Sequence, residues 1–178
     1  MHIKIPGERI GVLVGPSGSV KKMLEERTGA GLDIDSETGA VSIGSSGDPL
    51  QAMRLMDVVR AIGRGFSPEN ALSLLEDEIL MLDVMDLSKA SSSKSGIDRI
   101  RGRIIGKNGR TRETMERLTD CKVSVYGKTV SLIGNPEHVK IARNAIEMLV
   151  DGVPHGTVYG YLEKKSQEIV RSELRGGF

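Results

Sequence analysis

The sequence has very little cysteine and histidine. Cys121 is the one cysteine in 178 residues, which excludes an internal disulfide framework and a cysteine-based zinc ribbon, and the three histidines lack metal-ligand spacing. No apolar run approaches the roughly 20 residues that span a bilayer, and the polar start of the chain is unlike a signal peptide. We therefore expect a cytoplasmic protein with no metal, no cofactor and no membrane contact.

Aromatic residues are also scarce. There is no Trp, and the rings are Phe66, Tyr126, Tyr159, Tyr161 and Phe178. RNA-binding domains of the RRM and OB types depend on exposed stacking rings, so this composition counts against both. Tyr126, expected at a strand end beside Gly127, is the ring best placed to approach a base, and packing is the equal alternative.

Charge is balanced overall but not along the chain. The 25 basic and 24 acidic residues give zero net charge over residues 1–65, −5 over residues 66–93 and +6 over residues 94–178. Seven basic residues lie between Lys94 and Arg112, with Asp98 as the single acid among them. This density suits a polyphosphate partner, although a solvated basic surface is the alternative.

The chain contains an internal repeat. A shift of 91 positions aligns LVGPSGSVKKMLEERTGAGLDI, which begins at Leu13, with IIGKNGRTRETMERLTDCKVSV, which begins at Ile104. Gly15 then aligns with Gly106, and Gly18 aligns with Gly109. The repeat predicts two copies of one small domain.

Both copies have the same predicted order of elements: strand, two helices, two strands, helix. In the second copy Leu80, Leu82 and Val84 alternate as an opening strand, and Ser95 is expected to cap the first helix. The apolar positions of the following elements are Ile97, Ile100 and Ile104, then Thr111, Met115 and Leu118, then Cys121, Val123, Val125, Val130 and Leu132 around a Gly127-Lys128 turn, and finally Val139, Ala142, Ile146 and Leu149. The first copy repeats this order between residues 2 and 62.

The repeat also predicts the domain boundaries. We expect a first domain at residues 1–65, a linker helix at 66–79, a second domain at 80–152 and a C-terminal extension with a helix at 153–178. Ser67 and Pro68 are suited to the start of the linker helix, which should bury Leu72, Leu75 and Ile79 on one face.

A Gly-x-x-Gly motif lies between the first two helices of each copy. A tight turn without side chains at its corners lets a sugar-phosphate backbone lie against the peptide backbone, near the positive end of the following helix. The motif therefore predicts phosphate binding at this turn.

With its flanking elements, each copy resembles the type I KH domain, which clamps about four unpaired nucleotides. The resemblance implies an α+β fold of two tandem KH domains, each a three-stranded antiparallel sheet with three helices on one face. It also implies that Gly106, Lys107, Asn108 and Gly109 hold the RNA backbone and that Arg110 and Arg112 add phosphate contacts. Ile105, Val123 and Val125 would form the floor of the base-binding groove, and Arg99 and Arg103 would flank its opening.

The first copy departs from this pattern in its loop. Gly15-Pro16-Ser17-Gly18 has no basic residue, and its proline removes an amide donor. Glu25 and Glu26 offset two nearby lysines. Weaker RNA contact through Gly15, Ser17, Gly18, Lys21 and Lys22 is one interpretation, and a structural or protein-facing role is the other.

The whole chain resembles the archaeal form of a small-subunit ribosome assembly factor, whose eukaryotic relatives are called the partner of the Nob endonuclease. The resemblance rests on the tandem copies, on GRIIGKNGRT, and on the tail GVPHGTVYGYLEKKSQEIVRSEL with its expected Val-Tyr-Gly turn before a helix. It implies binding of single-stranded RNA near the 3′ end of small-subunit rRNA or its precursor. An endonuclease or another assembly or translation factor is the implied protein partner, and the lack of a long N-terminal extension favours an archaeal source.

Several alternatives remain. A sister assembly factor, a general RNA chaperone and a protein-interaction adaptor with secondary RNA contact are consistent with the same features, and the acidic residues 69–86 and the charged tail suit an adaptor. An enzyme is disfavoured, because the glycine loops lack the Gly-Lys-Ser/Thr ending of a P-loop and no histidine lies near Cys121 in the sequence.

Overall fold

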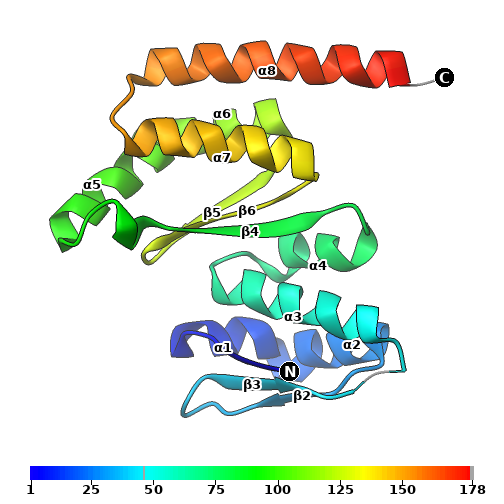
Figure 1. Cartoon of the computed structure of the whole chain (residues 1–178). Coiled ribbons are helices and arrows are strands. Elements are labelled where there is room, and N and C mark those ends of the chain that lie inside the picture. The colour runs from blue at the N-terminus through cyan, green and yellow to red at the C-terminus, as the bar shows by residue number, and fades with distance from the viewer. Residues whose placement is uncertain (46, 177–178) are drawn as a thin grey trace. The chain divides into compact units, whose positions relative to one another are not determined.

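The chain forms two compact units, Met1–Leu82 and Asp83–Phe178, in a computed structural model that describes residues 1–45 and 47–176. Each unit contains one three-stranded sheet with helices packed on it (Figure 1). The α+β architecture of two KH-like copies expected from the repeat is confirmed.

The first unit follows the predicted element order closely. Its elements are β1 (His2–Lys4), α1 (Gly7–Val14), α2 (Ser19–Thr28), β2 (Leu32–Ile34), β3 (Ala40–Ile43), α3 (Pro49–Gly63) and α4 (Pro68–Glu76). The sheet order is β1-β3-β2, and both pairs are antiparallel. Leu13, Leu24, Leu55 and Ile62 are fully buried in this unit.

Helix α4 buries a different face from the one predicted. Ser67 caps the helix as expected, by accepting a hydrogen bond from the Asn70 amide at 3.2 Å. Ala71 and Leu74 are buried, whereas Ile79 is 62% exposed and lies beyond the helix end. The helix stops at Glu76 because the Asp77 carboxylate accepts from the Ile79 amide at 2.9 Å, which forms a turn in place of the next helical residue.

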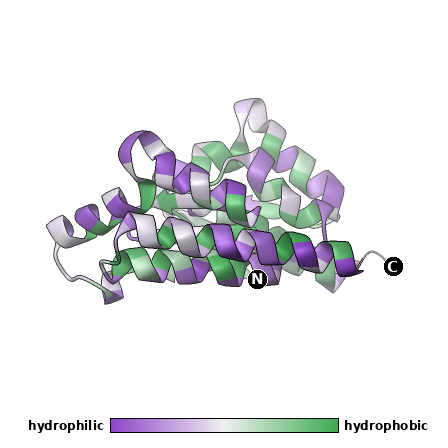
Figure 2. Ribbon diagram, turned by 90° about the horizontal axis from the view of Figure 1, so that it is seen from above, coloured by the Kyte–Doolittle hydropathy of each residue, from purple (hydrophilic) through white to green (hydrophobic). Residues whose placement is uncertain are grey.

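The second unit repeats the arrangement and adds one helix. Its elements are β4 (Met81–Asp86), α5 (Lys94–Ile105), α6 (Arg110–Thr119), β5 (Lys122–Tyr126), β6 (Thr129–Gly134), α7 (Pro136–Val150) and α8 (His155–Gly176). The sheet order is β4-β6-β5, and Tyr126 pairs with Thr129 across the Gly127-Lys128 turn. Apolar and polar residues alternate along the helices, as Figure 2 shows, and the predicted core positions of α5 and α7 are all buried.

The predicted inward face of β4 is wrong. Met85 and Leu87 belong to the core cluster of this unit, while Leu82 and Val84 are half-buried on the other side of the strand. Asp83 shares the inward side and forms an ion pair of 2.6 Å with Arg143 of α7. Asp83 thus interrupts the apolar pattern on the face of β4 that meets the helices, and its charge is compensated by the partly exposed Arg143.

Two local details also differ from expectation. The N-cap of α5 is Ser93 rather than Ser95, because the Ser93 hydroxyl accepts from the Gly96 amide at 3.0 Å. Val158, Tyr159 and Gly160 lie within α8 rather than in a turn before it.

Helix α8 packs on α6 and α7, where Val158 and Leu162 are buried. Residues 177 and 178 of the predicted extension, including Phe178, lie outside the described residues.

Helix α8 is long, with 22 residues, but strongly charged. Within residues 1–45 and 47–176, no helix has both the length and the apolar character that crossing a membrane requires.

Candidate nucleic-acid interface

The Gly-x-x-Gly motif of the second unit forms an exposed turn between α5 and α6, here called the 106–109 turn. Lys107 and Asn108 are exposed at its tip. Asn108 (φ 56°) and Gly109 (φ 75°) adopt left-handed conformations, which reverse the chain within four residues.

The amides of this turn are partly used by the turn itself. The Gly109 amide donates to the Gly106 carbonyl at 3.1 Å, and the Arg110 amide donates to the Lys107 carbonyl. This limits the amide contacts expected from the sequence. The side chains of Lys107, Arg110 and Arg112 are exposed beside the positive end of α6, an arrangement that suits a phosphate group.

The two glycines of the turn serve different purposes. A Cβ on Gly106 would lie 2.1 Å from the Thr111 hydroxyl oxygen, so this glycine permits close packing inside the protein. A Cβ on Gly109 would meet nothing within 4 Å. The outer corner at Gly109 is therefore open to a ligand backbone.

A basic groove lies between α5 and the β5–β6 turn. It has a volume of about 390 Å³, and its lining residues are Ser92, Lys94, Ile97, Asp98, Arg101, Gly127 and Lys128. Arg101 pairs with Asp98 at 3.8 Å, and its buried Nε has no hydrogen-bond partner among the described residues. The Arg101 side chain is still 34% exposed, so its guanidinium is a candidate contact for a phosphate or a base edge in this groove.

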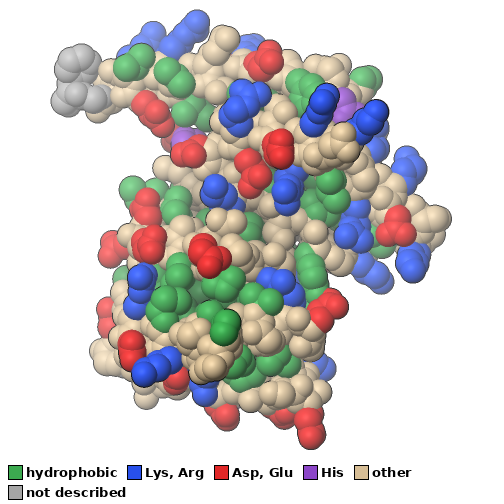
Figure 3. Space-filling view, turned by 180° about the vertical axis from the view of Figure 1, so that it is seen from behind, with side chains coloured by type: hydrophobic (Ala, Val, Ile, Leu, Met, Phe, Trp, Pro, Cys, Tyr) green, Lys and Arg blue, Asp and Glu red, His purple; other side chains and the backbone are tan. Residues whose placement is uncertain are grey.

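Sequence reasoning did not select Lys94, Arg101 or Lys128 as site residues. Helical periodicity could have identified two of them, because Lys94 and Arg101 are seven residues apart and therefore lie on one face of α5. Lys128 could be found only from the predicted β5–β6 turn. Figure 3 shows Lys and Arg side chains gathered at the edge of the molecule where α5 lies.

The three residues expected to form the floor of the base-binding groove do not line the basic groove, and they differ in their burial. Ile105 and Val125 are half-buried and retain some surface. Val123 is 4% exposed and belongs to the core cluster, so its side chain offers a bound base almost no surface. Alternation along β5 places Val123 and Val125 on one side of the strand, but it does not reveal how deeply each is covered.

Arg99 and Arg103 do not line this groove. They lie on another face of α5, in a second pocket that contains no residue of the first. Arg103 is bound to the protein: its Nε donates to the Leu149 carbonyl at 2.9 Å and its Nη2 to the Val153 carbonyl at 2.6 Å. Arg99 is exposed.

Helix α8 supports the two helices that meet at the 106–109 turn. The hydroxyls of Thr111 and Tyr159 are hydrogen bonded at 2.9 Å, and Nε2 of His155 lies 2.9 Å from the Arg103 carbonyl oxygen. Tyr159 and His155 were not among the predicted site residues. Their contacts fix α8 against the end of α5 and the start of α6.

The Gly-x-x-Gly motif of the first unit, the 15–18 turn, has nearly the same backbone shape. Gly15 (φ 75°, ψ 173°) matches Gly106 (φ 76°, ψ 171°), and Ser17 (φ 53°) matches Asn108. Pro16 and Ser17 are exposed at the tip but bring no positive charge. Of the nearby lysines, Lys22 is exposed and Lys21 half-buried. The first unit thus keeps the turn without the cations.

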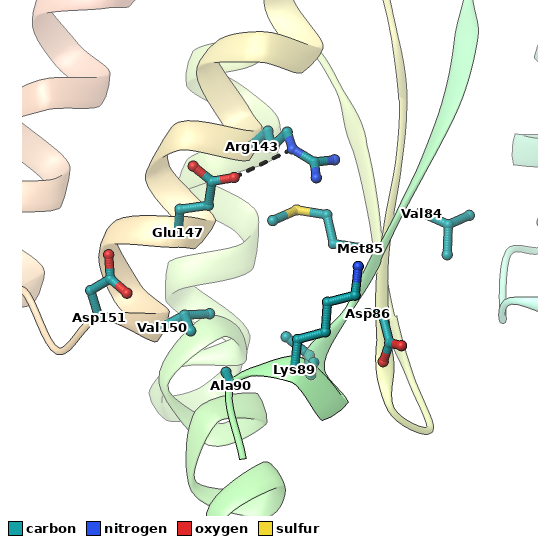
Figure 4. A pocket seen from close by; sticks show the side chains of 10 residues that line it. Val84, Met85, Asp86, Lys89, Ala90, Arg143, Glu147, Val150 and Asp151 are labelled. Atoms are coloured by element: carbon teal, nitrogen blue, oxygen red, sulfur yellow. Dashed lines mark ion pairs between the residues drawn. The ribbon is translucent and has the colours of Figure 1, made fainter. Parts of the chain in front are cut away.

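Another cavity, between β4 and α7, has a different character (Figure 4). Its volume is about 430 Å³, and both acidic and basic side chains line it. Arg143 already pairs with Asp83 at 2.6 Å and with Glu147 at 3.4 Å, and the Asp83 hydrogen bond raises the pKa of the guanidinium. The opposed charges make it a poor site for an anion.

Cys121 has no nucleophilic character. Its side chain is 1% exposed in the core, and burial raises the pKa of the thiol to about 11. The thiol is therefore protonated at neutral pH. Among the described residues, no three His, Cys, Asp or Glu side chains form a group that could hold a metal ion.

Comparisons with known proteins agree with this architecture. Residues 81–167 match the eukaryotic-type KH-domain family (KH-domain type I), and residues 1–57 match the KH domain family. The chain is 46% identical over 175 residues to a KH domain-containing protein of Methanocaldococcus jannaschii, covering 97% of this chain and 76% of that protein. It is 34% identical over 110 residues to the pre-rRNA-processing protein pno1 of Aspergillus fumigatus, covering 61% of this chain and 44% of that protein.

A solved structure is also similar. A chain in the crystal structure of the a/eIF2alpha-aDim2p-rRNA complex from Pyrococcus horikoshii superimposes on this protein with a TM-score of 0.89. The two chains are 47% identical, and the match covers 94% of each.

Proposed function

This chain belongs to the family of tandem KH-domain proteins that includes the pno1 and Dim2p proteins, and from this membership we propose that it binds single-stranded rRNA during ribosome assembly. The second KH domain, proposed at residues 80–152, supplies most of the affinity. The protein acts as a binder in the cytoplasm and catalyses no reaction.

The observation that carries this proposal is the contrast between the two turns. The 106–109 turn has Lys107 at its exposed tip, is followed by Arg110 and Arg112, and begins where α5, the helix that lines the basic groove, ends. The 15–18 turn has the same backbone shape but no basic residue at its tip. Because affinity for a phosphate backbone comes mainly from Lys and Arg, RNA binding is assigned to the second unit.

The target we propose is the region near the 3′ end of small-subunit rRNA or its precursor. Family membership supports an rRNA target, since one relative is a pre-rRNA-processing protein and another was crystallised with rRNA and a/eIF2alpha. An endonuclease, or an assembly or translation factor, is the protein partner that fits this position.

The test is a charge reversal at the tip of the 106–109 turn. The double variant Lys107→Asp/Asn108→Asp adds two carboxylates where phosphate should lie, and both residues are exposed, so folding should persist. We expect its affinity for short single-stranded RNA to fall at least tenfold, which is about 1.4 kcal/mol. Fluorescence anisotropy at fixed salt measures the affinity, and thermal unfolding checks the fold.

The matched control is Pro16→Asp/Ser17→Asp, which adds two carboxylates at the same positions of the 15–18 turn. Its RNA affinity should change by less than about threefold. Retained affinity in the Lys107→Asp/Asn108→Asp variant would falsify the assignment. An equal loss in both variants would assign RNA binding to the two turns together.

A further inference from the structure

We propose a second anion site behind the 106–109 turn, which holds a phosphate of the bound RNA strand outside the four nucleotides of the KH groove. The inference rests on the proposed function. The site is a pocket of about 450 Å³, here called the α8-side pocket, lined by Arg99, Gly102, Arg103, Gly106, Lys107, Arg110, Thr111, His155 and Tyr159.

The charge of the α8-side pocket is of one sign. Four of its lining residues are Lys or Arg, one is His, and none is Asp or Glu. Arg99, Lys107 and Arg110 are exposed, so their charged groups are available to a ligand. The β4–α7 cavity, which has a similar size, is lined by Asp86, Glu147 and Asp151 as well as by basic residues. The α8-side pocket differs from it because no acidic residue is among its lining residues.

The walls of the pocket are fixed before any ligand arrives. Arg103 is held at the back by the Leu149 and Val153 carbonyls, and its own carbonyl meets His155. The hydrogen bond between Thr111 and Tyr159 holds α8 at the opposite wall. The backbone that carries Arg99, Lys107 and Arg110 is therefore held in place, so an anion that binds here need only order these three side chains.

The internal repeat shows that these cations are specific to the second copy. With the shift of 91 positions, Arg99, Arg103, Lys107 and Arg110 align with Glu8, Val12, Pro16 and Ser19, and none of these is basic. Arg112, which lies outside the pocket, aligns with Lys21 and keeps its charge. The four cations of the α8-side pocket are therefore a feature of the second copy and not of the repeat as such.

The position of the pocket identifies the anion. Gly106 and Lys107 belong both to the 106–109 turn and to the pocket lining, and Arg110 follows the turn directly, so a strand that crosses the turn reaches the pocket without a gap. The basic groove opens on another face of α5, at Ile97 and Arg101. A strand held in the groove and over the turn would therefore place its next phosphate among Arg99, Lys107 and Arg110.

The test compares RNA lengths. The tetranucleotide ACAC should fill the groove alone, and the octanucleotide ACACACAC should also reach the α8-side pocket. In the full-length protein we expect Arg99→Gln to lower octanucleotide affinity about three- to tenfold and to reduce the ratio of octanucleotide to tetranucleotide affinity. The control Arg117→Gln removes a charge from the exposed end of α6 and should leave that ratio unchanged. An unchanged ratio in Arg99→Gln would overturn the inference.

Histidine resonances give an independent measurement. His155 is one of only three histidines, and His2 lies in the other unit, so imidazole NMR signals can be assigned by substitution. The octanucleotide should shift the His155 signal and the tetranucleotide should leave it in place. A His155 shift with inorganic phosphate but not with the octanucleotide would overturn the RNA assignment. A further outcome separates this site from the proposed function. If Lys107→Asp/Asn108→Asp binds neither RNA, while Arg99→Gln leaves the ratio of octanucleotide to tetranucleotide affinity unchanged, the proposed function stands and only this site is rejected.

Discussion

Arg103 donates a hydrogen bond of 2.9 Å from its Nε to the Leu149 carbonyl, and so ties α5 to the end of α7. The first unit has the same arrangement from a different helical position: Arg9 Nε donates to the Ile62 carbonyl at 2.7 Å, at the end of α3. In each unit a second guanidinium nitrogen reaches the carbonyl four residues further along, at Val153 or Phe66. Both units thus use an arginine to bind carbonyls at the end of the helix that follows the sheet, where the Leu149 and Ile62 carbonyls also accept from the Gly152 and Gly65 amides.

Arg103→Ala should therefore destabilise the protein. The change removes two charge-assisted hydrogen bonds, to the Leu149 and Val153 carbonyls, so we expect the free energy of unfolding to fall by about 2 kcal/mol. Arg99→Ala, an exposed change on the same helix, should cost less than about 0.5 kcal/mol. Urea unfolding followed by circular dichroism measures both. Equal stability of the two variants would contradict a structural role for Arg103.

RNA affinity should depend on salt. If Arg101, Lys107, Arg110 and Arg112 each neutralise one phosphate, the slope of log affinity against log salt should be about −3 for a single strand. Arg110→Gln should reduce the size of this slope by about 0.7. Titrations between 50 and 300 mM KCl measure the slope. Affinity that is independent of salt would indicate that this surface binds a protein.

Stability should fall at alkaline pH because of Cys121. The folded thiol has a pKa of about 11, whereas an unfolded thiol titrates at roughly 8.5, so above that value the unfolded chain loses its proton first. The free energy of unfolding should fall by roughly 1.4 kcal/mol per pH unit between these two pKa values and be unaffected below them. Cys121→Ala should lack this component. Parallel slopes for the two proteins would show that another group titrates.

The 15–18 turn should accept the chemistry of the 106–109 turn. Because the backbone angles of the two turns agree within a few degrees, Pro16→Lys/Ser17→Asn should place a cation at an exposed tip without refolding the loop. In the Lys107→Asp/Asn108→Asp background, we expect the substituted turn to recover part of the RNA affinity, about two- to fivefold. Binding that stays at the level of the background variant would show that the first unit lacks more than tip charge.

Periodicity predicted most of the fold, and its errors have physical causes. Ile97, Ile100 and Ile104 were placed correctly on the buried face of α5 because a helix with one buried face repeats its apolar residues every three or four positions. Strand β4 has apolar residues on both faces, so alternation favoured Leu82 and Val84 over Met85 and Leu87. Only the ion pair between Asp83 and Arg143 reveals why a carboxylate belongs on the inward face.

The site was predicted less completely than the fold. The exposed 106–109 turn follows from the repeat, but the division of α5 into a groove face and an α8 face does not. Arg99 and Arg101 are two residues apart in a basic run, and their separation appears only when the pitch of the helix and the position of α8 are both known. In the same way, an arginine that binds RNA and one that binds backbone carbonyls, such as Arg103, look identical in a sequence.

The two turns share a shape because each is held from inside. Gly15 fits against Val20 as Gly106 fits against Thr111, and these contacts leave the two tip positions without any part in folding. After a gene duplication, either copy can therefore change its tip to residues that tolerate the left-handed conformation of Ser17 and Asn108 without disturbing these contacts. One copy is then free to lose its ligand, or to gain another, while the hairpin of helices around it persists.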